Sequence, residues 1–284
     1  MTGSVASSSV LSCGKYRLDL ARPLIMGIVN VTPDSFSDGG LHARADAAVA
    51  HARALIAAGV DILDIGGEST RPGAEPVPLR EELDRVLPVI AALAEEGVPL
   101  SIDTYKPEVM RQAVAAGASL INDVFALRQP GALEAAAETD AAVCLMHMQG
   151  TPQTMQADPS YGDVVTEVAG FLAGRAADCE AAGIARSRIV VDPGFGFGKS
   201  TEHNIALLRG LGRVGASTGL PLLVGLSRKS VLGRITTREK VTDRVAASVA
   251  SALVAVQQGA RILRVHDVSA TLDMLRVWQA VEAA

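Results

Sequence analysis

The sequence has few aromatic residues, few cysteines and no long apolar run, and each shortage excludes a class of protein. Aromatic residues make up only 3% of the chain, which argues against a surface that stacks nucleic-acid bases. No window contains the ~18 uninterrupted apolar residues of a membrane-spanning helix. The three cysteines, Cys13, Cys144 and Cys179, lie far apart and form no CxxC pair, so we expect neither a disulfide framework nor a cysteine-rich zinc site.

Charge and composition narrow the choice further. The 284 residues include 26 Lys and Arg against 31 Asp and Glu, a net charge of −5 with no dense basic run, so we expect neither nucleic acid nor a membrane as partner. A hydrophobic share of 49% is that of a globular protein. The Ser-rich residues 1–14 lack the basic and apolar pattern of a signal peptide. We therefore expect a soluble cytoplasmic protein.

What the sequence does contain is a regular alternation of short apolar runs with alanine-rich stretches of helical spacing. The apolar runs begin at residues 24, 62, 99, 120, 142, 189, 221 and 262. Such runs are typical of parallel strands that are covered on both faces. Helical spacing is clearest over 44–59 and 242–258, and Pro88 is expected to kink the helix over 79–96 or to reset its start.

Eight strand–helix units fit into residues 24–281, and eight is the number that closes a barrel. An open, doubly wound sheet alternates in the same way, but it usually has fewer units and polar edge strands. The sequence therefore predicts an α/β fold with a single TIM-type (β/α)8 barrel as the catalytic domain over 24–284. Residues 1–23 form a short N-terminal extension, in which 16–20 is expected to be a small extra strand.

Cationic side chains follow or end several of the expected strands, where a barrel enzyme places its active site. These are Arg71, Lys229, Arg264 and His266. Together they suit an anionic, phosphorylated ligand. Arg264 interrupts an apolar strand, where an unpaired charge is costly, so it must face a ligand or a partner. The structural alternative for Arg264 is an ion pair with Asp64, which interrupts the second strand.

Acidic and amide side chains end three other strands. Asp103, Asn122 and Asp192 suit a heterocycle with an amidine-like edge, because a carboxylate accepts two hydrogen bonds and an amide both donates and accepts. Each of them taken alone could instead be a loop or helix N-cap residue. Their common place at strand ends favours a binding site.

Other signals are weaker. The run GFGFGKS at 194–200 resembles a phosphate-binding P-loop, but that motif requires glycine at the position of Pro193, so we interpret the run as a loop over a ligand. The sequence contains no HExxH motif and no clear nucleophile triad, so neither catalytic zinc nor covalent catalysis is expected. Displacement of a phosphorylated leaving group, with Mg²⁺ bound by oxygen ligands, is the chemistry that these groups favour.

The motifs at these strand ends resemble those of the dihydropteroate synthase family, transferases of folate biosynthesis. The matching stretches are NVTPDSFSDGG (30–40), GGESTRPG (66–73), SIDT (101–104), NDV (122–124), LMHMQGTPQTMQ (145–156), DPGFGFGKS (192–200), GLSRKS (225–230) and RVHDV (264–268). They follow in family order, one set per strand end. Ser200 stands where threonine is common, and residues 1–14 have no counterpart that we recognise.

The resemblance implies that the protein joins p-aminobenzoate to (7,8-dihydropterin-6-yl)methyl diphosphate, giving 7,8-dihydropteroate and diphosphate. It also implies that Asn30 binds Mg²⁺ and helps to bind the diphosphate. The residues implied for the pterin and its diphosphate are Thr70, Asp103, Asn122, Met146, Asp192, Lys229, Arg264, Val265 and His266. Those implied for p-aminobenzoate are Phe36, Arg71, Pro72, Phe197 and Ser227.

We hypothesise a dissociative, SN1-like substitution, since the electron-rich dihydropterin can delocalise the cation left by diphosphate. Asp38 would support that cation, and the catalytic residues are expected to be Asp38, Arg71, Asp103, Lys229 and Arg264. Two alternatives are a corrinoid methyltransferase that binds a pterin and an inactive pterin-binding paralogue. The family resemblance also implies a homodimer formed through the last helices, and sensitivity to sulfonamides, which mimic p-aminobenzoate.

Overall fold

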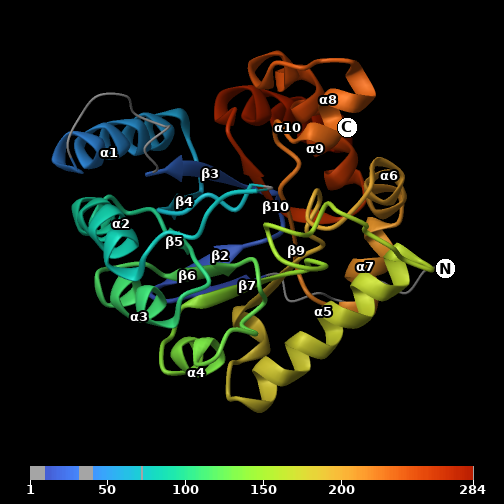
Figure 1. Ribbon diagram of the computed structural model, residues 1–284. Helices are drawn as coiled ribbons and strands as arrows, with labels where there is room; N and C mark the ends of the chain where they lie inside the picture. The colour runs from blue at the N-terminus through green and yellow to red at the C-terminus, as the bar shows by residue number, and fades with distance from the viewer. Residues whose placement is uncertain (1–9, 32–40, 72, 284) are drawn as a thin grey trace.

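The chain forms a closed barrel of eight parallel strands surrounded by helices (Figure 1). The computed structural model describes residues 10–31, 41–71 and 73–283. Around the barrel the strands are β3 (Leu24–Asn30), β4 (Ile62–Gly66), β5 (Leu100–Asp103), β6 (Leu120–Asp123), β7 (Ala142–Met146), β8 (Ile189–Asp192), β9 (Leu222–Val224) and β10 (Ala260–Val265). β10 pairs with β3, Ile262 opposite Leu24, and so closes the ring. The prediction of a (β/α)8 barrel from eight apolar runs is confirmed.

Helices follow the strands and cover the outside of the barrel. They are α1 (Leu41–Ala58), α2 (Leu79–Leu93), α3 (Pro107–Ala115), α4 (Ala132–Ala137), α5 (Val164–Ala181), α6 (Thr201–Arg209), α7 (Leu211–Thr218), α8 (Ser230–Thr236), α9 (Val245–Gln257) and α10 (Val268–Glu282). Short 3₁₀ turns precede β8 (Arg186–Arg188) and α9 (Val241–Arg244). Within the described residues no helix is both long and apolar enough to cross a membrane.

Of the two outcomes expected for Pro88, the structure excludes a reset of the helix. α2 runs without a break from Leu79 to Leu93, with Pro88 inside it. Proline removes one backbone hydrogen bond from a helix interior. The buried face of α2, which includes Val86, Val89 and Ile90, keeps the helix in place because it packs on the barrel core.

The alternation of side chains along the strands produces two apolar layers. Ile25 and Val29 of β3 point outward into the large core between strands and helices. Leu24 and Met26 point inward, into a smaller cluster at the amino ends of the strands. Since successive side chains of a strand point to opposite faces, the inward positions nearer the carboxyl ends are left for polar groups.

An antiparallel hairpin covers the amino end of the barrel. Its strands are β1 (Val10–Cys13) and β2 (Tyr16–Asp19), and Leu11 and Cys13 of β1 are buried in the inner cluster. The small strand expected over 16–20 is confirmed. Its partner β1 was not predicted, because four residues with one hydroxyl among them give too little periodicity to stand out.

Candidate active site at the mouth of the barrel

Asp64 lies at the centre of a polar cluster inside the barrel. Its side chain is fully buried, and it accepts hydrogen bonds from Ser101 Oγ at 2.5 Å and Asn122 Nδ2 at 3.3 Å. Arg264 Nε donates to Asp64 Oδ2 at 2.6 Å. Asp64, the structural alternative that the sequence suggested for Arg264, is therefore its partner, and it lies 200 residues earlier in the chain.

Arg264 contacts a second carboxylate as well. Its Nη2 atom donates to Asp103 Oδ2 at 2.6 Å, so one guanidinium joins the acidic groups of β4 and β5. The Arg264 side chain remains 21% exposed. A guanidinium has further N–H groups beyond these two, and they leave Arg264 able to bind an anion while both carboxylates stay compensated.

Burial changes the protonation of the acids at the mouth. It raises the pKa of Asp103 to about 7, although Arg264 opposes the shift. Burial also raises the pKa of Asp192, whose Oδ1 accepts the Gly194 amide at 2.7 Å, while Lys229 opposes the shift. Carboxylates that are poorly solvated gain most from a ligand that brings N–H donors, because the ligand replaces the missing water. Asp103, Asn122 and Asp192 therefore form an edge that suits a protonated or N–H-rich heterocycle.

Lys229 lies between the polar edge and an aromatic ring. Its Nζ donates to the Phe195 carbonyl and sits 4.6 Å from the centre of the Phe197 ring. Burial lowers the pKa of Lys229 to about 8, with Asp192 opposing the shift. Its ammonium remains mostly charged at neutral pH and can contact both a ring and an anion.

An apolar cluster borders the polar one. Met146, Met148 and Met155 are buried together, and the partly buried rings of Phe125 and Phe197 pack against them. Polarisable thioethers and aromatic rings make a suitable floor for a flat ligand. Met146 ends β7, directly beside the end of β8 at Asp192.

His266 differs from what its sequence position suggested. The sequence grouped it with the cations, but burial, together with Arg264 and Arg228, lowers the pKa of His266 to about 4. The ring is therefore neutral at pH 7. Its Nδ1 lies 3.0 Å from Ser227 Oγ, and its backbone N–H donates to the same oxygen at 3.1 Å. In the protein without ligand, His266 therefore offers a hydrogen-bond donor and no positive charge, and its contact with Ser227 orients the ring.

Of the other expected site residues, some lie at the rim of the barrel and others do not. Asn30 ends β3 opposite Gly66, at the same rim. Thr70 is partly buried and Arg71 exposed in the loop after β4, where the Arg71 amide contacts Ser69 Oγ at 3.4 Å. The side chain of Val265 packs in the outer apolar layer, away from the polar cluster. Phe36, Asp38 and Pro72 lie outside the described residues.

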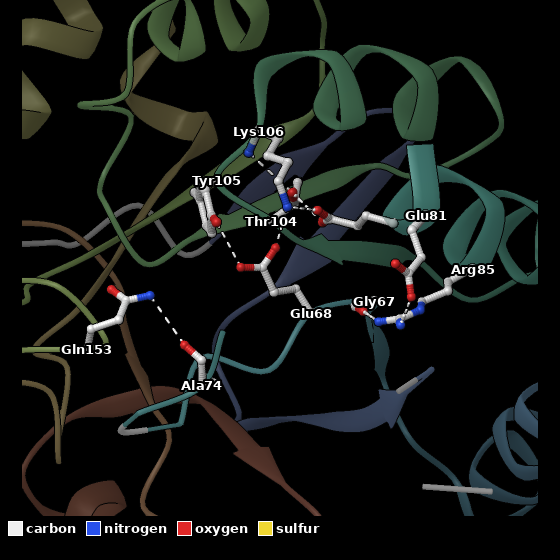
Figure 2. A network of polar contacts seen from close by, with 10 residues as sticks. Gly67, Glu68, Ala74, Glu81, Arg85, Thr104, Tyr105, Lys106 and Gln153 are labelled. Atoms are coloured by element: carbon white, nitrogen blue, oxygen red, sulfur yellow. Dashed lines mark hydrogen bonds and ion pairs between the residues drawn. The ribbon is translucent and has the colours of Figure 1, made fainter. Parts of the chain in front are cut away.

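Two groups of polar residues at the mouth were not predicted. Lys199 of the GFGFGKS run is buried beneath it, and its Nζ contacts His147 Nδ1 at 2.9 Å, the Gly194 carbonyl at 2.9 Å and the Phe197 carbonyl at 3.0 Å. The second group, around Glu68, Tyr105 and Lys106, is drawn in Figure 2. The resemblance of 194–200 to a P-loop could have drawn attention to Lys199. No local motif could have indicated the Glu68 group, because its members come from separate loops.

The oxygen and nitrogen donors at the mouth determine which metal ion the site suits. Within 10–31, 41–71 and 73–283, no three side chains of His, Cys, Asp or Glu come together as a cation cage. Asn30 is a single oxygen donor at the rim. Mg²⁺ commonly keeps several waters and binds through few protein oxygens plus substrate phosphates, so this donor set fits a magnesium ion that arrives with a diphosphate.

Comparison with known proteins points to one family. The model of the family described as "Pterin binding enzyme" matches residues 26–266. Dihydropteroate synthase of Neisseria meningitidis serogroup B is 54% identical over 277 residues, 96% of this chain and 97% of that protein. Solved structures of dihydropteroate synthases from Xanthomonas albilineans with 4-aminobenzoic acid and from Burkholderia cenocepacia with 7,8-dihydropteroate are similar.

The structural agreement extends over nearly the whole chain. The Xanthomonas structure has a TM-score of 0.92 and 57% identity, and covers 97% of this chain and 99% of that one. The Burkholderia structure has a TM-score of 0.89 and 54% identity, and covers 97% of both. The barrel fold is thus shared with dihydropteroate synthases whose structures contain 4-aminobenzoic acid in one case and 7,8-dihydropteroate in the other.

Proposed function

The chain belongs to the pterin-binding enzyme family and, within it, to the dihydropteroate synthases, and we propose that its barrel mouth joins p-aminobenzoate to (7,8-dihydropterin-6-yl)methyl diphosphate. The products are 7,8-dihydropteroate and diphosphate. The observation that carries the assignment to this site is Arg264, which joins two buried carboxylates and keeps N–H groups for an anion. A pterin-binding protein that handles no diphosphate would need this cation only to compensate the two acids, and would have no use for its remaining N–H groups.

The pterin is held by the acidic edge of the cluster. Asp103, Asn122 and Asp192 accept and donate along its amidine-like edge, and Met146 packs on its face. Lys229, beside Asp192, reaches the ring as well. The two acids, poorly solvated when no ligand is bound, favour the positive charge that the dihydropterin acquires during the reaction.

The leaving group is held on the cationic side. Arg264 and neutral His266 donate hydrogen bonds to diphosphate oxygens, and Thr70 borders the same pocket. The exocyclic carbon–oxygen bond breaks, and its electron pair leaves with the diphosphate. Asn30 would hold Mg²⁺ together with the diphosphate, and the ion would offset the negative charge that develops there.

p-Aminobenzoate attacks the cationic methylene from the loop side. Arg71, Ser227 and Phe197 frame the arylamine, with Phe36 and Pro72 added from the motifs, and Asp38 supports the cation. The amine nitrogen forms the new bond to the methylene and then loses one proton to water. Because the methylene is already cationic, a weak nucleophile suffices and no strong base is required.

The oligomeric state is proposed from the last helices. Val277 and Val281 on α10 are 67% and 69% exposed, and Val254 on the adjacent α9 is 41% exposed. An exposed set of valines on neighbouring helices favours a self-complementary dimer interface. Cytoplasmic localisation agrees with three cysteines that are all buried and free.

The decisive experiment measures diphosphate release and dihydropteroate formation in parallel, with the pterin diphosphate and Mg²⁺, with and without p-aminobenzoate. Dihydropteroate formation that requires both substrates is the expected result. Slow diphosphate release without p-aminobenzoate supports the dissociative route, and none at long times counts against it. Pterin binding with no product at all would overturn the proposed activity and favour a binding paralogue. Sulfonamides, as arylamine mimics, are expected to compete with p-aminobenzoate alone.

A further inference from the structure

The first residues of the loop after β4 are fixed by buried charges. We define the loop root as residues 67–71, the segment that leads to Thr70 and Arg71. The Glu68 side chain is 8% exposed and forms an ion pair with Lys106. Its Oε1 also accepts the Tyr105 hydroxyl at 2.7 Å (Figure 2). Burial and the Glu68 carboxylate raise the pKa of Tyr105, so that hydroxyl stays a donor.

Lys106 connects the root to α2. It forms a second ion pair with Glu82 of α2, whose side chain is 1% exposed and also accepts Thr104 Oγ1 at 2.7 Å. One ammonium thus serves two buried carboxylates, and burial raises the pKa of Glu82 although Lys106 opposes the shift. Breaking such a buried pair costs much more than breaking an exposed one, because the remaining charge stays buried.

The backbone of the root is held against the same helix. Arg85 of α2 donates from Nη1 to the Gly67 carbonyl at 2.7 Å. A Cβ atom at Gly67 would lie 2.8 Å from Val86 Cγ1 and 3.1 Å from Glu82 Cγ, so only glycine allows this approach. The root is therefore fixed twice: through the Glu68 side chain, which contacts Tyr105 and Lys106, and through the Gly67 backbone, which contacts α2.

The far end of the loop has weaker contacts. Gly73 N donates to the Pro152 carbonyl at 3.2 Å, and Gln153 Nε2 donates to the Ala74 carbonyl at 3.2 Å. Both are neutral hydrogen bonds, whereas the root has charge-assisted ones, which are about twice as strong. The path of the chain from β4 to Thr70 and Arg71 is thus determined mainly by the contacts of Glu68.

We propose that Glu68 is a positioning residue for the arylamine half of the site. It acts through the loop root on Arg71, and Tyr105 and Lys106 act through Glu68. This inference rests on the proposed function, in which Arg71 frames p-aminobenzoate. The pterin edge, Asp103, Asn122 and Asp192, lies at the ends of strands β5, β6 and β8, which are held by their own pairing in the barrel, so the effect of Glu68 falls mainly on p-aminobenzoate.

The test compares Glu68→Gln with Tyr105→Phe. Gln keeps the shape of the side chain but removes its charge, and we expect the KM for p-aminobenzoate to rise roughly tenfold, the size of a lost hydrogen bond to a charged group. Tyr105→Phe removes one of these bonds and should raise this KM about threefold. The dissociation constant of the pterin diphosphate, measured by calorimetry, should change less than about twofold. The double variant should resemble Glu68→Gln alone, because the Tyr105 hydroxyl, the group that Tyr105→Phe removes, contacts Glu68.

A matched control removes a charge from an exposed ion pair. Glu138→Gln breaks the contact with Arg111, whose Nε lies 2.8 Å from Glu138 Oε2, and should leave both constants unchanged. An unchanged KM in Glu68→Gln, or an equal loss of pterin affinity, would overturn the positioning role.

A second readout does not depend on turnover. Amide hydrogen exchange of residues 69–71 should be faster in Glu68→Gln than in the unsubstituted protein and in Glu138→Gln. If the unsubstituted protein forms no dihydropteroate, the proposed function fails, and this exchange measurement still decides whether Glu68 fixes the loop. Equal exchange in all three proteins would reject the inference by itself.

Discussion

Arg264 contacts two buried carboxylates, and this sharing determines what its removal does. Arg264→Ala leaves Asp64, which has no exposed surface, and Asp103 without their cation. We expect kcat/KM to fall by several orders of magnitude and the free energy of unfolding to fall by roughly 3–5 kcal/mol. Steady-state kinetics and urea unfolding measure the two losses, and His51→Ala, on an exposed face of α1, should change neither. A variant with normal kinetics would show that Arg264 is structural only.

Asp103 makes pterin binding depend on pH. Its pKa is raised to about 7 in the protein without ligand, and a ligand N–H requires the ionised carboxylate as acceptor. Affinity for the pterin should therefore be constant above pH 7 and should fall below it, by up to about tenfold per pH unit. Calorimetric titrations from pH 5.5 to 8.5 measure this dependence. In Asp103→Asn the part of the slope due to this residue should vanish; an identical slope there would assign it to another group.

At the scale of elements, the GFGFG turn between β8 and α6 is built around Lys199. Burial lowers the pKa of Lys199 to about 7, although Asp192 opposes the shift. The unfolded chain has a lysine of ordinary pKa, near 10.5, so between about pH 7 and 10.5 it binds more protons than the folded protein. The free energy of unfolding should therefore rise with pH in this window, by at most about 1.4 kcal/mol per unit from this group.

Lys199→Met tests this assignment. Urea unfolding at pH 7, 8 and 9 should give a smaller rise in stability for the variant than for the unsubstituted protein. The comparison between the two proteins removes the contributions of Lys229 and of the buried cysteines, which both share. Parallel stability curves would show that Lys199 is not the group that titrates.

The elements were more predictable than the contacts between them. The eight barrel strands follow from apolar runs and turn signals, which are local, and so each of them lies where it was expected, whereas the short strand β1 was not predicted. The joining of Asp64 to Arg264 spans 200 residues and was only one of two alternatives, because a sequence does not say which inward positions face each other. Nothing in the sequence indicated the ion pairs of Lys106, because its partners, Glu68 and Glu82, lie on a different loop and on a helix. The neutral state of His266 likewise depends on burial that only the folded barrel creates.

At the scale of the whole molecule, the exposed valines of α10 predict self-association. Val277→Asp and Val281→Asp together should convert a dimer to a monomer, because two charges would be placed in an apolar interface. Sedimentation velocity measures the change. Leu79→Asp, on α2 and also exposed (42%), is the matched control and should leave the oligomeric state unaltered. An unsubstituted protein that sediments as a monomer would refute the dimer.

The 200-residue separation between Asp64 and Arg264 also has a consequence for synthesis. At about 5–20 residues per second, a ribosome needs roughly 10–40 s after making Asp64 to supply its cation. During that time the growing chain holds the acids of β4 and β5 but not β10, the strand that carries Arg264 and closes the ring. The barrel therefore closes, and Asp64 and Asp103 gain their cation, at the same time, when the ribosome releases β10. A chain cut short before Arg264 would not be a weaker enzyme but an open sheet with uncompensated acids, a substrate for quality-control proteases.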